Sequence, residues 1–216
     1  MSFYWVSTGS FIKALFSKYV WAIPNQENKI FLTFDDGPIP EITEWVLEEL
    51  KKYDAKATFF CIGNNIEKNP AIFNKILADG HAIGNHTFNH RNGWKSSLED
   101  YIEEVRLCDL QIKAHTSTEG LLFRPPYGKL KPAQARELRK KGYKIIMWEV
   151  LSADFDHSIS PQKCLKNVIS NTTSGSVVVF HDSIKGYENL KYTLPIALKY
   201  WHQKGYRFEG ITKLNL

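Results

Sequence analysis

The chain is poor in cysteine and has no long apolar run. Its three cysteines, Cys61, Cys108 and Cys164, are odd in number, widely spaced and include no C-x-x-C pair, which argues against a disulfide framework and against a thiolate zinc site. No apolar stretch approaches the length of a membrane span, so no transmembrane segment is expected. Residues 1–20 carry neither a basic leader nor a small-residue cleavage site, so the sequence predicts no secretory signal and, by default, a cytoplasmic location.

A strong excess of one sign of charge is also lacking. The formal net charge is +5 over 216 residues, and the short basic runs fall where helices are expected to end, a place that favours cations. A nucleic-acid partner is therefore not indicated. With 43% hydrophobic residues the chain can bury a core of its own, and its length fits one compact, monomeric domain.

The first helical pattern lies near the N-terminus. Apolar and aromatic residues recur at helical spacing from Phe11 to Val20, with Lys13, Ser17 and Lys18 between them, which predicts an amphipathic helix. Packing on the core is the ordinary role of such a helix. The alternative is a peripheral contact with a membrane surface, because aromatic-rich amphipathic helices also bind there.

Beyond Pro24 the sequence alternates between apolar runs and helical patterns. The apolar runs predict seven strands: Ile30–Phe34, Ala57–Ile62, His81–Gly84, Leu121–Phe123, Lys144–Val150, Val177–Phe180 and Tyr206–Ile211. The helical patterns, several with proline at the start or glycine after the end, are Glu41–Tyr53, Ala71–Asp79, Ser97 to about His115, Pro132–Lys141, Pro161–Ser170 and Tyr187–Lys204. Strict alternation predicts an α/β fold with a parallel sheet, either open and doubly wound or closed as a barrel.

Polar residues at the strand ends favour the barrel. Directly after five of the predicted strands stand Asp35, Asp36, His86, His90, Arg124, Asp154 and His181. In (β/α) barrels the reactive groups gather at the carboxyl ends of many different strands. We therefore expect these side chains to share one rim.

Two of these motifs together indicate a metal site. Thr33–Pro38 ends a buried strand with Asp35 and Asp36, whose side chains point in different directions and can have different roles; a helix-capping turn is the simpler interpretation. His86 and His90 are four residues apart, a spacing that a helical turn brings onto one face. Two histidines and one carboxylate, with positions left open for water and substrate, are typical of a catalytic divalent site such as zinc.

Arg124 and His181 directly follow two other predicted strands. Arg124 precedes two prolines that stiffen its loop, and its guanidinium would favour the ionised form of a neighbouring carboxylate; an ordinary surface arginine is the alternative. His181 emerges from a buried apolar strand, where an unpaired imidazole tends to lose its proton. To act as an acid it needs an anionic partner, and Asp154 is better placed for this than Asp156 or Asp182.

The order of these motifs from Lys29 to Ile211 resembles that of the polysaccharide deacetylases, carbohydrate esterase family four, also called the NodB-homology domain. The resemblance implies a distorted (β/α) barrel of about seven strands over residues 29–216, preceded by an N-terminal helix and lead-in over residues 1–28. It also implies a metal-dependent hydrolase that removes N-acetyl groups from poly- or oligosaccharides containing N-acetylglucosamine, with an acetylated carbohydrate as its partner.

The resemblance further implies a role for each motif residue. The metal ligands would be Asp36, His86 and His90. Asp35 would be the catalytic base, held by Arg124, and His181 would be the acid, oriented by Asp154. The backbone N–H of Tyr127 would stabilise the oxyanion. Zinc is the expected metal, with cobalt, nickel and manganese as alternatives.

Two positions depart from the family pattern. The segment Leu151–Phe155 lacks the first aspartate of the usual D-x-x-D-W motif and has Phe155 in place of the tryptophan, and Val179 replaces a usual leucine. Both residues are expected beside the acetyl methyl group, so the changes bear on substrate fit more than on chemistry.

Other functions remain open at this stage. An O-acetyl xylan esterase or a cyclic amide hydrolase on the same scaffold is the first alternative, although esters need less help at the leaving group, so the pair His181 and Asp154 favours an amide. A non-catalytic carbohydrate-binding protein is the second, and the complete set of motif residues argues against it. Trp94 and Trp201 are candidates for stacking on sugars, whereas tryptophan on a helix more often packs in the core.

Overall fold

The computed structural model describes residues 4–117, 121–212 and 215–216. Residues 1–3 of the predicted lead-in, and residues 118–120 and 213–214 of the predicted barrel, lie outside the described part. Among the helices that are described, none is both long and apolar enough to cross a bilayer.

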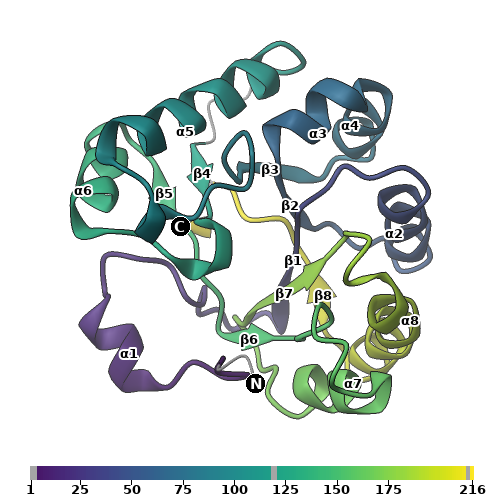
Figure 1. Ribbon diagram of the computed structural model, residues 1–216. Coiled ribbons are helices and arrows are strands. Elements are labelled where there is room, and N and C mark those ends of the chain that lie inside the picture. Colours follow the sequence, from purple (N-terminus) through teal and green to yellow (C-terminus); the bar gives the residue numbers. More distant parts are fainter. Residues whose placement is uncertain (1–3, 118–120, 213–214) are drawn as a thin grey trace.

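The strands form a parallel sheet that curls into a barrel, with helices around its outside (Figure 1). The strand order is β5-β4-β3-β2-β1-β7-β6, with β8 beside β1. The strands are β1 (Lys29–Asp35), β2 (Thr58–Cys61), β3 (Ala82–Asn85), β4 (Leu122–Phe123), β5 (Lys144–Ile145), β6 (Val150–Leu151), β7 (Val177–His181) and β8 (Arg207–Phe208). The prediction of a distorted α/β barrel of about seven parallel strands is confirmed.

The helices lie between consecutive strands, as the alternation predicts, except for α1, which precedes β1. They are α1 (Ser10–Leu15), α2 (Ile42–Lys51), α3 (Gly63–Lys68), α4 (Pro70–Ala78), α5 (Leu98–Lys113), α6 (Pro132–Lys140), α7 (Pro161–Ile169) and α8 (Tyr187–Gln203), with short 3-10 turns η1 (Gly93–Lys95) and η2 (Pro126–Gly128). Helix α3 was not predicted. It follows β2 directly, and its N-cap residue Ile62 makes no side-chain capping bond, so no local start signal marks it.

The prediction of one strand over residues 144–150 is wrong, because this segment contains β5 and the first residue of β6, two strands that do not pair with each other. β5 pairs with β4, and β6 pairs with β7. The residues between them cross the open side of the barrel. There Met147 donates its N–H to the carbonyl of Val20, and Val20 donates to the carbonyl of Ile145.

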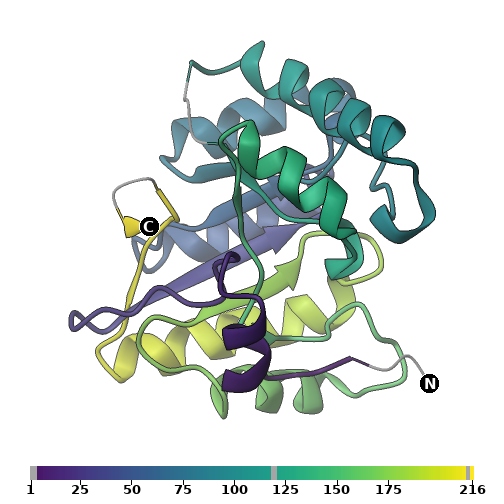
Figure 2. The same ribbon diagram turned by 90° about the vertical axis from the view of Figure 1, so that its left-hand side faces the viewer.

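The N-terminal segment fills this open side. Ser7 pairs with Val150 of β6, and Val20 pairs with Ile146 after β5. These backbone bonds explain why α1 ends at Leu15, well short of the predicted Val20: the chain must extend to reach the barrel. In Figure 2, α1 (dark purple) lies in front of the barrel, below α6.

The helix α1 packs on the core less than expected. None of its residues is buried. Ile12 contacts the apolar cluster around Trp21, whereas Phe11 is 77% exposed and Leu15 is 64% exposed. The predicted packing of this helix on the core is therefore seen for one side chain, that of Ile12.

The alternation of side chains along β1 positions the polar residue that follows. Ile30, Leu32 and Phe34 pack outward against the surrounding helices. Phe31 packs in a separate cluster with residues of other strands, so it faces the interior of the barrel. Since successive strand residues face opposite sides, Asp35 faces the interior as Phe31 does.

Candidate active site at the carboxyl ends of the strands

The strand register brings the predicted site residues to one end of the barrel. Asp35 and His181 are Cα partners in the β1–β7 pair, and Asn85, which precedes His86, is paired with Phe123, which precedes Arg124. The arrows of β1 and β7 point the same way in Figure 2. The expectation of a shared rim therefore matches the arrangement of the strands.

Three of these residues form a cluster that can hold a metal ion. Asp36, His86 and His90 each present one ligand atom, and these atoms lie within 4.8 Å of one another. Asp36 Oδ1 is 3.3 Å from His90 Nε2 and 3.7 Å from His86 Nε2. Asp36 Oδ1 is also buried without a hydrogen-bond partner among the described residues. A buried carboxylate oxygen is costly to leave unpaired, so this donor set fits a cation between the three side chains.

The two histidines are in the form that a metal needs. His86 Nδ1 lies 2.8 Å from the carbonyl oxygen of Arg124, which directs Nε2 toward the cluster. Burial, reinforced by the neighbouring His90, lowers the pKa of His86 to about 3. Burial also lowers the pKa of His90, against the effect of Asp36. Neutral imidazoles are the metal-binding species.

The histidines do not lie on a helical turn, so that part of the prediction is wrong. They stand on an irregular loop after β3, in which Thr87 and His90 have φ angles of 65° and 54°. The N–H of Thr87 donates to Asn85 Oδ1 at 2.8 Å, and the N–H of Asn89 donates to a carboxylate oxygen of Glu104 at 2.7 Å. These bonds hold the loop so that the two imidazole rings are 5.1 Å apart.

Arg124 lies inside the barrel beside Asp35. Its Nη1 is 2.7 Å from Asp35 Oδ1, and its side chain is fully buried. Nη1 also donates to Thr33 Oγ1, while Nε and Nη2 donate to the carbonyl oxygens of Ile146 and Met147. The planar group is therefore fixed on three sides, which excludes the alternative of an ordinary surface arginine.

His181 pairs with Asp154. His181 Nδ1 is 2.7 Å from Asp154 Oδ1, and the backbone N–H of His181 donates to Asp154 Oδ2 at 2.8 Å. Burial disfavours the charged imidazole, but the attraction of Asp154 outweighs it and raises the pKa of His181 to about 9. Asp156 bonds instead to Tyr4 and Ser158, so it does not compete for His181.

The remaining predicted residues surround this pair and the metal-ligand cluster. Tyr127 has a φ of 61° in η2, and its ring centroid is 4.5 Å from that of His90. Phe155 meets the ring of His181 edge-on at 4.9 Å. Val179 is buried in the same small apolar cluster that Phe155 packs against. Both positions that depart from the family pattern thus lie in one apolar patch next to His181.

Asp182 is a site residue that the sequence did not reveal. It is fully buried, accepts the N–H of Gly37 at 3.1 Å, and accepts the hydroxyl of Thr43 at 2.5 Å. Burial raises its pKa to about 8. A Cβ on Gly37 would lie 2.0 Å from Asp182 Oδ2, so this contact holds the loop that carries Asp36. Its position next to His181 was the available signal in the sequence, but only the fold brings its side chain to Gly37 after β1 and to Thr43 of α2.

The two tryptophans considered for sugar stacking differ in their exposure to solvent. Trp201 is fully buried in the core between α8 and the sheet, and Trp94 is 61% exposed on η1. Trp94 alone of this pair can meet a sugar.

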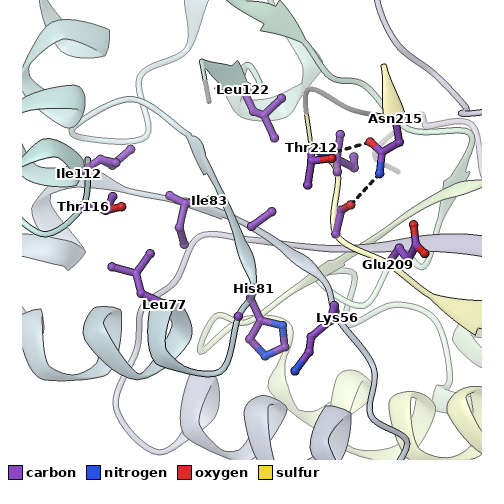
Figure 3. A pocket seen from close by; sticks show the side chains of 14 residues that line it. Lys56, Leu77, His81, Ile83, Ile112, Thr116, Leu122, Glu209, Thr212 and Asn215 are labelled. Carbon is purple, nitrogen blue, oxygen red and sulfur yellow. Dashed lines mark hydrogen bonds between the residues drawn. The ribbon is translucent and has the colours of Figure 1, made fainter. Parts of the chain in front are cut away.

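A second pocket lies at the opposite end of the barrel, near the starts of β2, β3 and β4 (Figure 3). None of the predicted site residues lines it. Its polar groups already have partners: Lys56 donates to the carbonyl of Asp79, His81 Nδ1 accepts the N–H of Ala57, and Asn215 bonds to the backbone of Gly210 and Thr212. The predicted site residues thus lie at the carboxyl end of the strands and away from this pocket.

Comparisons of the sequence and of the structure with known proteins point to the same family. A polysaccharide deacetylase family model matches residues 22–146. A peptidoglycan-N-acetylglucosamine deacetylase of Bacillus cereus is 35% identical over 199 residues, covering 90% of this chain and 91% of the relative. A chitooligosaccharide deacetylase of Azorhizobium caulinodans is 32% identical, covering 74% and 76%. A crystal structure of a peptidoglycan N-acetylglucosamine deacetylase superposes with a TM-score of 0.86 at 29% identity, covering 94% and 95%.

Some other relatives are longer proteins. The chain spans 62% of a second peptidoglycan-N-acetylglucosamine deacetylase of Bacillus cereus.

Proposed function

The chain belongs to the polysaccharide deacetylase family, and from this membership we propose that it is a metal-dependent hydrolase that removes N-acetyl groups from N-acetylglucosamine units of a poly- or oligosaccharide. The bond that it cleaves is a linear amide. Residues 29–216 are the proposed catalytic domain, and residues 1–28 lead into it.

The observation that carries this proposal is the buried oxygen of Asp36 facing His86 and His90. We assign these three residues as the ligands of a divalent ion. One carboxylate oxygen and two imidazole nitrogens are donors that zinc accepts readily, and they leave positions open for water and substrate; cobalt, nickel and manganese are the alternatives to test. When bound, such an ion would polarise the acetamide carbonyl and lower the pKa of a water toward about 7.

Asp35 is the proposed base. Its Oδ1 is engaged by Arg124, while Oδ2 faces His86 Nε2 at 4.0 Å. The free oxygen therefore points toward the metal-ligand cluster, where it can take the proton of a water that attacks the acetyl carbon. Since Arg124 is fixed by three further acceptors, the carboxylate is held in one orientation.

The other groups complete the hydrolysis. The backbone N–H of Tyr127 is the proposed donor to the oxyanion of the tetrahedral intermediate, an interaction commonly worth about 3 kcal/mol. His181 then gives its proton to the amide nitrogen as the carbon–nitrogen bond breaks, releasing acetate and a free amine. The apolar patch of Phe155 and Val179 next to His181 would contact the acetyl methyl group.

The pairing of His181 with Asp154 favours an amide over an ester substrate. An amine is a poor leaving group unless it is protonated, and Asp154 raises the pKa of the imidazole to about 9. An O-acetyl esterase would need this acid less.

The experiment that tests the function is acetate release from N-acetylglucosamine oligomers and from acetylated xylan, using metal-free enzyme and enzyme reloaded with zinc or cobalt. We expect release from the amide substrate only with metal. Release only from xylan would identify an esterase. No release from either substrate with full metal occupancy would contradict the proposal.

The N-terminal segment supports a further part of the proposal, a peripheral contact with an anionic lipid surface. Phe11 and Leu15 are largely exposed. Lys13 is paired with Glu149, so Lys18 is the cation next to this apolar face that could contact an anionic lipid. Co-sedimentation with anionic vesicles should fall in a Phe11→Ser/Leu15→Ser variant and persist in a Leu110→Ser/Ile196→Ser control. Equal co-sedimentation of both variants would contradict the contact.

Two points about the whole protein stay predictions. We propose a monomer, which sedimentation velocity tests. The cytoplasmic location is a prediction from the sequence, which cell fractionation tests.

A further inference from the structure

A groove beside the proposed metal site carries three cationic side chains. Arg91, Lys95 and Lys129 line it together with His90 and Tyr127, and none of its described lining residues is acidic. The Nε of Arg91 is 3.7 Å from a carboxylate oxygen of Glu104, so this charge is partly compensated. Among the described residues, neither Lys95 nor Lys129 has such a carboxylate partner.

An exposed aromatic surface connects these cations to the site. Trp94 and Tyr127 are 61% and 60% exposed. Lys129 Nζ is 5.2 Å from the centre of the Trp94 ring and 6.0 Å from that of Tyr127. The Tyr127 ring is tilted against that of His90, with 4.5 Å between their centres. Exposed rings with a polar edge are suited to stacking on sugars. A glycan that places one acetamido group at His90 would therefore pass over Tyr127 toward Trp94 and Lys129.

The groove is built from two loops that are held together. The side-chain amide of Gln134, fully buried, donates to the carbonyl of Gly93 at 2.9 Å, and Lys131 donates to the carbonyl of Ser96 at 2.7 Å. A Cβ on Gly93 would lie 2.4 Å from the carbonyl oxygen of Lys129, so η1 and the loop after η2 approach as closely as a glycine permits. The cationic side chains thus extend from a fixed backbone, and little ordering remains to oppose binding.

We propose that this groove binds a carboxylate of the substrate, carried by the sugar next to the one that is deacetylated, so that the preferred glycan is anionic. The inference rests on the proposed function and adds a specificity contact to the same site. Cations gathered in one groove repel one another, and a substrate carboxylate relieves this repulsion, whereas a neutral glycan supplies no opposite charge. A lactyl ether on an amino sugar and a uronic acid are the two sources of such a carboxylate.

Four tetrasaccharides separate these cases. Each contains N-acetylglucosamine: a peptidoglycan tetramer with free lactyl carboxylates, the same tetramer with these groups converted to primary amides, a tetramer that alternates with glucuronic acid, and the neutral chitotetraose. Binding to the zinc-loaded enzyme is measured by calorimetry, and acetate release is measured separately. We expect the free lactyl carboxylate to bind about two- to fivefold more tightly than its amide at low salt, with a smaller ratio at high salt. Tighter binding of the glucuronate tetramer would support the groove and identify the uronic acid as the source.

Two matched double variants test whether the lysines of the groove cause the preference for the carboxylate. Lys95→Gln/Lys129→Gln should reduce the carboxylate-to-amide ratio to about one, while Lys163→Gln/Lys199→Gln, which removes the same charge from α7 and α8, should keep the wild-type ratio. Equal binding of carboxylate and amide by the wild type, or an unchanged ratio in the groove variant, would overturn the inference. Carboxylate-dependent binding without acetate release would support the groove and contradict the proposed deacetylation, whereas acetate release with equal binding would contradict the groove alone.

Discussion

Arg124 and Asp35 form an ion pair inside the barrel, with 2.7 Å between Nη1 and Oδ1 and both side chains almost inaccessible to solvent. Arg124 directly follows β4 and Asp35 ends β1, two strands that are not neighbours in the sheet. The pair therefore spans the interior and links the proposed base to the opposite wall.

Arg124→Met should destabilise the protein strongly. The substitution leaves the Asp35 carboxylate buried without its partner, a change that typically costs about 3–5 kcal/mol. Urea unfolding followed by circular dichroism measures it. Arg124→Lys keeps the charge but loses the bonds to Ile146 and Met147, so a smaller loss is expected. A methionine variant as stable as the wild type would show that the pair is not needed for the fold.

Asp35→Asn should abolish turnover while the metal stays bound. The amide keeps the shape of the side chain but cannot accept the proton of the attacking water, and general-base catalysis commonly contributes about 10²- to 10⁴-fold. Acetate release and metal content by plasma mass spectrometry are the two measurements. His86→Ala is the comparison, since it should lose the metal itself. If Asp35→Asn also loses its metal, Asp35 is a ligand and the assignment of the base is wrong.

Asp154→Asn should shift the alkaline limb of the pH–rate profile to lower pH. His181 must be protonated to act as the acid, and its pKa of about 9 depends on Asp154 against the opposing effect of burial. Without this carboxylate, burial is opposed only by the charges of Asp35 and Asp36, so the pKa of His181 falls. If the alkaline limb lies at the same pH in Asp154→Asn as in the wild type, His181 is not the group whose titration causes it.

The same pair makes stability depend on pH. Because the folded pKa of His181 is raised from 6.5 to about 9, the stabilisation is fully present below about pH 6.5 and is lost as the pH rises through about 9. The difference in unfolding free energy between wild type and Asp154→Asn should therefore be larger at about pH 6 than at about pH 10. Equal differences at both pH values would contradict the linkage.

Asp182→Ala should weaken both the fold and metal binding. It leaves the N–H of Gly37 and the hydroxyl of Thr43 without their acceptor, at a cost of about 1–3 kcal/mol for each buried group left unsatisfied. Because the Gly37 bond holds the loop of Asp36, the affinity for zinc should fall as well. Asp156→Ala, which removes a half-buried neighbour, is the control and should leave zinc affinity unchanged. Wild-type affinity in the Asp182 variant would separate this residue from the site.

Removal of the metal should lower the melting temperature. An ion that binds the native state alone adds about 2.7 kcal/mol at a concentration one hundred times its Kd. Thermal unfolding with a chelator and with restored zinc measures this shift. His90→Ala should show a reduced response to zinc, and a full response in that variant would remove His90 from the ligand set.

Much of this protein follows from short-range patterns in its sequence. Alternating apolar runs and capped helices predict a parallel α/β barrel because they report which side of each segment is buried. Polar residues such as Asp35 and His181 at the strand ends predict one rim, since the carboxyl ends of parallel strands meet at the same edge.

Contacts between distant segments decided the rest. The extension that ends α1 at Leu15 depends on the backbone of residues 145–151, and the loop of His86 and His90 depends on Glu104 of α5. Neither partner lies within the span that local periodicity can sense.

Trp94 and Asp182 show where prediction from the sequence ends and tertiary structure is needed. Both residue types fit either a packing or a functional role by sequence. The sequence by itself determined which reactive residue types are present and which predicted strand each of them follows. Only the tertiary structure decided which side chains face each other, because the direction of a side chain is set by the register and loop contacts that close the barrel.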